Sequence, residues 1–138
     1  MDVQMAVGVA EKLLPGDGPI ADEFDPRWRA LLALRREVGA EPDAIWEFLR
    51  RWGASENTSL RHALAVCLLQ ELLALHFLSY FPRVAELVRE EHRFADTFLR
   101  CGKQGQAALP AQSEAFDELT RFAAKWCGTG TGSLATGV

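Results

Sequence analysis

The sequence predicts an all-α fold of five to six helices, and three observations support this prediction. Apolar residues recur at helical spacing along most of the chain, whereas the two-residue alternation typical of a half-buried strand is absent. Proline and glycine separate the apolar segments at intervals of helix length. The chain has 138 residues, 49% hydrophobic and 25% charged, which is enough for one globular core. We therefore expect a single domain over residues 1–127 and a flexible tail over residues 128–138.

Capping signals divide the chain into its predicted helices. Asp25-Pro26 places an N-cap acceptor before a proline at the first helical position, and Gly39 offers a C-cap. Pro82 is expected to begin a helix, because proline is tolerated in a first turn and disrupts a helix interior. The predicted helices cover residues 3–14, 26–38, 42–52, about 58–79, 82 to about 100, and 113–126.

The segment from Leu60 to Leu78 is predicted to be the central helix. Its apolar residues occur on nearly every face, as expected for a helix packed by neighbours all round. Gln70, Glu71 and His76 interrupt the apolar run, and a membrane span rarely carries three such groups in its middle. Because the N-terminus also lacks the pattern of a secretion signal, we expect a cytoplasmic protein without membrane contact.

The composition argues against several kinds of function. The net charge of −4 disfavours nucleic acid as the main partner, since such binding depends on neutralising phosphates. Cys67, Cys101 and Cys127 form neither a disulfide framework nor a CxxC zinc motif. We predict that His92 makes a surface contact with Asp96, which lies one turn later on the same helix face. We therefore expect no catalytic residue, no metal and no cofactor.

One helix pair carries a family resemblance. From Ala44 the chain runs Ala-Ile-Trp-Glu-Phe-Leu-Arg-Arg-Trp, turns at Gly-Ala-Ser-Glu-Asn-Thr-Ser, and continues Leu-Arg-His-Ala-Leu-Ala-Val-Cys-Leu-Leu to Leu69. This resembles a HEAT-type repeat, with one clear unit over residues 44–79. The resemblance implies a compact right-handed stack of antiparallel helix pairs that binds other macromolecules. The run from His76 to Pro82 is similar to small bacterial HEAT-like proteins, some of which serve as immunity factors for toxins.

Arginines near helix ends are the candidate interface. Residues 27–61 carry a net charge of about +2, and the rest of the chain about −6. In a repeat stack Arg50, Arg51 and Arg61 would approach one inter-helix turn. The alternative is that they cap helices and pair with Glu47, Glu56 and Glu71. The predicted partner-binding residues are Arg50, Arg51, Trp52, Arg61, Tyr80, Arg93 and Lys103.

These observations favour a non-enzymatic module that binds another protein. We expect the partner to have an acidic surface, and the module to act in toxin immunity or as an adaptor. The alternative is a small nucleic-acid-associated module related to alkylation-repair-type HEAT proteins. An enzyme would need a pocket where His76, Glu71 and Tyr80 converge. The oligomeric state stays open at this point.

Overall fold

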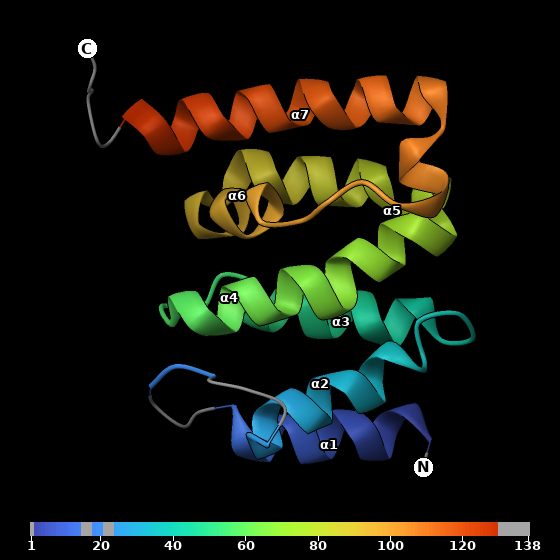
Figure 1. Ribbon diagram of the computed structural model, residues 1–138, viewed down its shortest axis with the longest axis vertical. Helices are drawn as coiled ribbons and strands as arrows, with labels where there is room; N and C mark the ends of the chain where they lie inside the picture. The colour runs from blue at the N-terminus through green and yellow to red at the C-terminus, as the bar shows by residue number, and fades with distance from the viewer. Residues whose placement is uncertain (1, 15–17, 21–23, 130–138) are drawn as a thin grey trace.

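The computed structural model describes residues 2–14, 18–20 and 24–129, and every regular element in this part of the chain is helical (Figure 1). The prediction of an all-α fold is therefore confirmed. When α4, η1 and α5 are counted as one helix with a kink at His76, the described residues contain six α-helices, as expected. The elements are α1 (Val3–Leu13), α2 (Pro26–Arg35), α3 (Pro42–Trp52), α4 (Thr58–Leu64), the π-helical η1 (Ala65–Leu69), α5 (Gln70–Glu90), α6 (His92–Leu99), the 3-10 helix η2 (Gly105–Ala108) and α7 (Pro110–Thr129).

The predicted starts of α2 and α4 are capped by a side chain, whereas Glu41 makes no side-chain cap for α3 and α7 begins at Pro110, ahead of the predicted residue 113. The Asp25 carboxylate accepts a hydrogen bond from the Arg27 backbone N–H at 2.9 Å, ahead of Pro26 in the first turn. The Asn57 side chain accepts from the Leu60 N–H at 3.1 Å and so fixes the start of α4. The C-terminal helix runs on to Thr129, past the predicted start of the tail at residue 128, and residues 130–138 lie outside the described residues.

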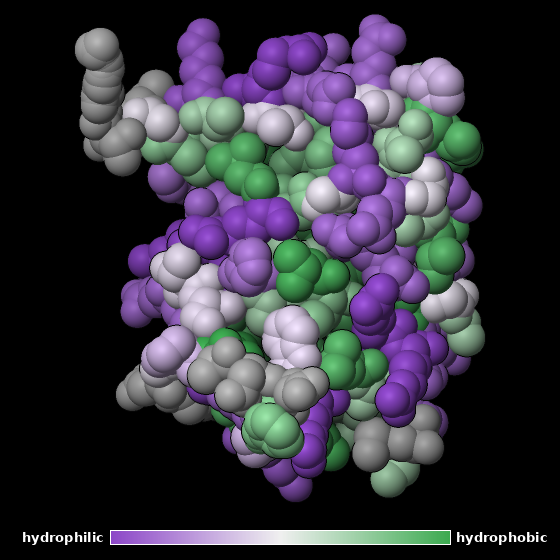
Figure 2. Space-filling view, in the orientation of Figure 1, coloured by the Kyte–Doolittle hydropathy of each residue, from purple (hydrophilic) through white to green (hydrophobic). Residues whose placement is uncertain are grey.

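The helices lie one above another, from α1 and α2 at the N-terminal end of the molecule to α7 at the other end (Figure 1). The continuous helix from α4 to α5 crosses the middle and contacts α2, α3, α6 and α7. Its neighbours bury apolar side chains against it from both directions. Figure 2 shows hydrophilic side chains along the outer edge of α7 and a mixture of hydrophobic and hydrophilic ones across the middle of the molecule. Fully buried large side chains include Leu31, Leu34, Phe48, Leu68, Phe94 and Phe98.

The central helix breaks at His76, and the expected boundary at Pro82 is wrong. The backbone of His76 has φ −138° and ψ 45°, which is non-helical, while Pro82 lies inside the helix that continues to Glu90. The Gln106 amide fills the break: its Oε1 accepts from the Phe77 N–H at 2.9 Å, and its Nε2 donates to the Leu75 carbonyl at 2.8 Å. A distant side chain thus supplies the hydrogen bonds that the helix loses there.

A second difference lies at Glu91. The sequence predicts one helix from residue 82 to about residue 100, but Glu91 is extended (φ −126°, ψ 109°) and separates α5 from α6. The turn lets α6 fold back against α5 and lie beside α7. Neither glycine nor proline stands between Glu90 and His92, so no local signal predicts this corner.

The stretch Thr58–Glu90 is long and apolar enough to cross a membrane by length and composition alone. Half of its most apolar window is buried inside the molecule, and the core helix of a protein without a membrane passes the same test. Glu71 on this helix lies 3.5 Å from Arg35 of α2. These contacts fit the predicted role of the segment as a core helix.

Candidate functional site

A groove of about 350 Å³ lies between α3 and α5. We call it the α3–α5 groove. Its apolar part is the Trp46 ring, which is almost fully buried, together with Leu87. Pro42 begins α3, so that Trp46 follows one turn later and faces the core from the first half of this helix. The lining residues are Trp46, Arg50, Arg83, Glu86, Leu87 and Glu90.

Aromatic and charged groups brace one end of the groove. The Tyr80 ring lies 6.5 Å from the Trp46 ring, and its hydroxyl donates to the Asp43 carboxylate. The Arg83 guanidinium lies 4.9 Å from the centre of the Tyr80 ring and 3.7 Å from Asp43. Burial, and then the hydrogen bond to Asp43, raise the pKa of Tyr80 to about 12. Tyr80 is therefore neutral near pH 7 and ties α3 to α5.

The free charge in the groove is negative. Arg50 pairs with Glu47 on the same helix at 2.8 Å, and the hydrogen bond that its guanidinium donates to Glu47 raises the pKa of Arg50. Glu86 and Glu90 are exposed, one helical turn apart, and neither has an ion-pair partner among the residues that the structure describes. The groove thus offers two unpaired carboxylates beside an apolar surface.

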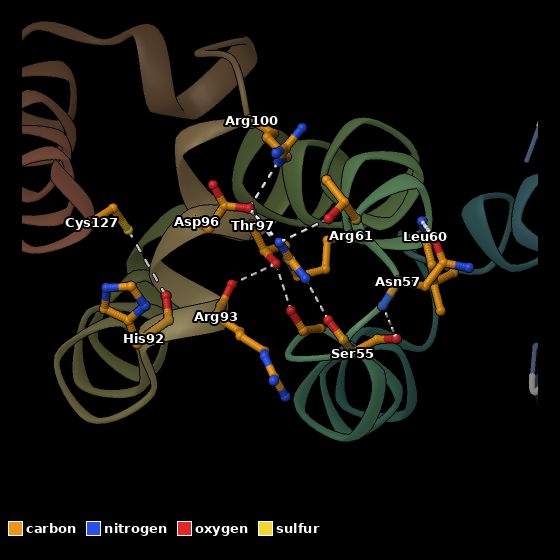
Figure 3. A network of polar contacts seen from close by, with 12 residues as sticks. Ser55, Asn57, Leu60, Arg61, His92, Arg93, Asp96, Thr97, Arg100 and Cys127 are labelled. Carbon is orange, nitrogen blue, oxygen red and sulfur yellow. Dashed lines mark hydrogen bonds and ion pairs between the residues drawn. The ribbon is translucent and has the colours of Figure 1, made fainter. Parts of the chain in front are cut away.

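A second polar centre, the Arg61–Asp96 clasp, joins the α3–α4 turn to α6 (Figure 3). Arg61 is 9% exposed, and its guanidinium donates to the Ser55 carbonyl at 2.6 Å and to the Asp96 carboxylate at 2.9 Å. Arg100 donates to the same carboxylate at 3.1 Å. Burial alone would raise the pKa of Asp96, but the hydrogen bonds from Arg61 and Arg100 outweigh it and lower that pKa.

The clasp is reinforced by close packing. The buried Thr97 hydroxyl donates a hydrogen bond of 2.5 Å to the carbonyl of Gly53, the C-cap residue of α3. A Cβ at Gly53 would lie 2.7 Å from the Phe94 ring, so only glycine fits there without a shift. These contacts hold the α3–α4 turn directly against α6. We conclude that the clasp is structural.

The seven residues predicted to bind a partner do not form one surface. Arg50 lines the α3–α5 groove, whereas Arg51 turns toward α1 and pairs with Glu11. The expected meeting of Arg50, Arg51 and Arg61 at one turn is therefore wrong, because adjacent residues of a helix point in different directions and Arg61 turns inward. Of the alternative pairings, only that of Arg50 with Glu47 occurs. Glu56 pairs with Arg93 and Glu71 with Arg35, so neither contacts Arg51 or Arg61.

Burial removes two of the predicted residues from the surface. Arg61 lies within the clasp, and Tyr80 is 4% exposed beneath the groove. Trp52 is half-buried against Phe48, and its indole Nε1 is buried without a hydrogen-bond partner. Lys103 lies at the far end of the molecule, where it pairs with Asp117 at 2.8 Å.

The predicted His92–Asp96 contact is also wrong. The His92 ring packs edge-on against Trp126 of α7 at 5.1 Å between ring centres, while Asp96 faces the two arginines of the clasp. The residues in or beside the groove that the sequence did not indicate are Arg83, Glu86, Glu90 and Asp43. Their charge and one-turn spacing are visible in the sequence, but their position opposite Trp46 follows from the fold-back of α5 after His76.

Cysteine and metal chemistry find little support in the described part of the chain. Burial raises the pKa of the Cys67 thiol to about 11 and that of Cys101 to about 12, so both are protonated near pH 7. Among the described residues no group of three or more histidine, cysteine, aspartate or glutamate side chains is placed to hold a metal ion. Glu71 pairs with Arg35 and does not converge with His76 and Tyr80.

Comparisons of this chain with protein-family models, with curated proteins and with solved structures find no match.

Proposed function

We propose that this chain is a non-enzymatic module that binds another protein through the α3–α5 groove. The observation that carries the proposal is the combination of an apolar floor with two unpaired carboxylates on a rigid helix pair. Protein interfaces combine an apolar centre with a polar rim, and complementary charges across the contact help to select the partner. The protonated, buried thiols of Cys67 and Cys101 support a binding role over nucleophilic catalysis.

The charges of the groove define the chemistry of the partner. Arg50 and Arg83 already contact the acidic groups of this chain, whereas Glu86 and Glu90 are free. We therefore change the expected partner surface from acidic to basic. A lysine or arginine of the partner would lay its aliphatic stem along Leu87 and place its charged end between the two carboxylates.

The same charges weaken the nucleic-acid alternative. Phosphate recognition requires cationic groups that are free to neutralise it. In the groove, Glu86 and Glu90 would repel a phosphate backbone, and the arginines would first have to leave Glu47 and Asp43. Toxin immunity is one use that a basic partner and an occluding mode of action would suit, and a toxin gene beside the gene for this chain would support it.

Site-specific photocrosslinking in the source cell tests the proposal. A photoreactive amino acid at position 86, at the edge of the groove, should crosslink one protein through a peptide that contains lysine or arginine. The matched control is position 118 on α7, where Glu118 is also an exposed helical glutamate. Equal adducts at both positions, or adducts with nucleic acid at position 86, would contradict the proposal.

A further inference from the structure

The outer face of α1 carries a second unpartnered surface. Met5 is 59% exposed and Val9 43% exposed, although both are large apolar residues on an ordered helix. They follow the spacing i and i+4, and Lys12 follows at i+7, so the three side chains share one stripe. Asp2 caps the same helix one turn before Met5. We call these four residues the α1 stripe.

An apolar hollow lies beside the stripe. It has a volume of about 270 Å³ and opens between α1 and α2. Except for Arg29, its lining is apolar, which suits an unbranched apolar side chain of a partner. The lining residues are Ala6, Val9, Pro26, Arg29, Ala30 and Ala33.

The charges at the two ends of the stripe are complementary to each other. Asp2 stands at the N-terminal end and Lys12 at the C-terminal end, and both are exposed. The apolar pair, Met5 and Val9, is centred on the same position, residue 7, as this charged pair. If two copies of α1 run antiparallel about that position, Asp2 meets Lys12 of the second copy, and Met5 meets Val9. A two-fold interface requires this reciprocity, in which each residue of one copy meets the same partner residue in the other.

We propose that two copies of this chain associate through the α1 stripe, with Met5 of each copy entering the hollow between α1 and α2 of the other. Position 8 is glycine, and a Cβ there would meet nothing within 4 Å, so the second helix can approach closely. With 11 residues, α1 is about 16 Å long. The contact is small, and the structure therefore assigns a reversible dimer.

Analytical ultracentrifugation of the full chain, from low micromolar to several hundred micromolar, tests the proposal. The unmodified chain should pass reversibly from monomer to dimer in this range. Met5→Gln should weaken the dimer about tenfold or more, because it places an amide in the apolar hollow. In the monomer it should be harmless, since glutamine at this position completes a capping box with Asp2.

A second pair of variants tests the antiparallel register. Lys12→Glu should weaken the dimer because the introduced carboxylate would face Asp2 of the other copy. Adding Asp2→Asn, which keeps an N-cap acceptor, should recover part of this loss. Lys125→Gln removes an exposed lysine from α7 and should leave the dimer unchanged. A chain that is monomeric at every concentration, or Met5→Gln and Lys125→Gln variants with equal dimer affinity, would overturn the proposal. If the Asp2→Asn, Lys12→Glu double variant dimerises no more tightly than Lys12→Glu alone, the antiparallel register is wrong.

Discussion

At the scale of single residues, the most consequential side chain is Arg61. The sequence predicts it at the α3–α4 turn, and the structure places it there, but its guanidinium faces inward to Ser55 and Asp96. The position of an arginine along the chain can be predicted from a capping pattern. Its direction depends on Asp96, which lies 35 residues further on and reaches Arg61 only when α6 folds back.

Replacing Asp96 by asparagine should destabilise the protein. The Arg61 guanidinium would stay buried without its carboxylate partner, which we expect to lower the free energy of unfolding by about 2 kcal/mol. This is less than for a fully buried pair, because the Asp96 side chain is 29% exposed. Urea denaturation measures the change. Asp117→Asn, which removes the exposed partner of Lys103, is the matched control and should lose about 0.5 kcal/mol or less. Similar losses in the two variants would show that the clasp is no stronger than a surface pair.

The same carboxylate predicts a pH dependence. The pKa of Asp96 is lowered in the folded chain from its ordinary value of 3.8. Its ionised form therefore contributes stability above that value, and the contribution is lost as the pH falls through the lowered pKa. The difference in unfolding free energy between the unmodified chain and Asp96→Asn should be constant at about pH 6 and shrink between about pH 4 and pH 2. A difference that grows on acidification would contradict the assigned direction of the shift.

At the scale of elements, the break at His76 decides the course of the chain. The apolar pattern predicts the central helix correctly, and Pro82 is the strongest visible signal for its end. The break occurs earlier because Gln106 offers an amide that satisfies Leu75 and Phe77 at once. A side chain 29 residues away supplies the hydrogen bonds, so the position of the break cannot be predicted from local sequence.

Gln106→Leu should destabilise this junction. The Phe77 N–H and the Leu75 carbonyl would lose their partner, which we expect to reduce the unfolding free energy by about 1 kcal/mol, because Gln106 is exposed and water can replace part of this bonding. The Phe77 amide should also exchange with solvent deuterium faster than in the unmodified chain, and NMR can follow both effects. Gln104→Leu is the control, because Gln104 is exposed and precedes the same 3-10 turn. If Phe77 exchange is unchanged in Gln106→Leu, the glutamine does not hold the break.

At the scale of the whole molecule, the all-α class and the single core follow from periodicity and composition, which are properties of the sequence. The α3–α5 groove does not follow from them. Arg50 belongs to it and was indicated by the sequence, but Glu86 and Glu90 looked like an ordinary solvated face of a helix. They line the groove only because the turn at His76 brings the second half of α5 alongside α3.

The two surfaces proposed to bind partners differ in chemistry. The groove between α3 and α5 is polar with a small apolar floor, as suits contact with another protein. The α1 stripe at the end of the stack is apolar at its centre and self-complementary in charge. Because the two surfaces lie on different helices, a variant of one should leave the other intact.

The affinity of charge-reversed variants for the crosslinked partner tests the central claim most directly. The Glu86→Lys, Glu90→Lys double variant reverses both free carboxylates of the groove, and Glu114→Lys, Glu118→Lys makes the same change in charge and spacing on α7. Calorimetric titration with the purified partner should show at least about a hundredfold weaker binding for the groove variant, or about 2.8 kcal/mol. The α7 variant should bind within about threefold of the unmodified chain. Equal losses in both variants, or undiminished binding by the groove variant, would contradict the account.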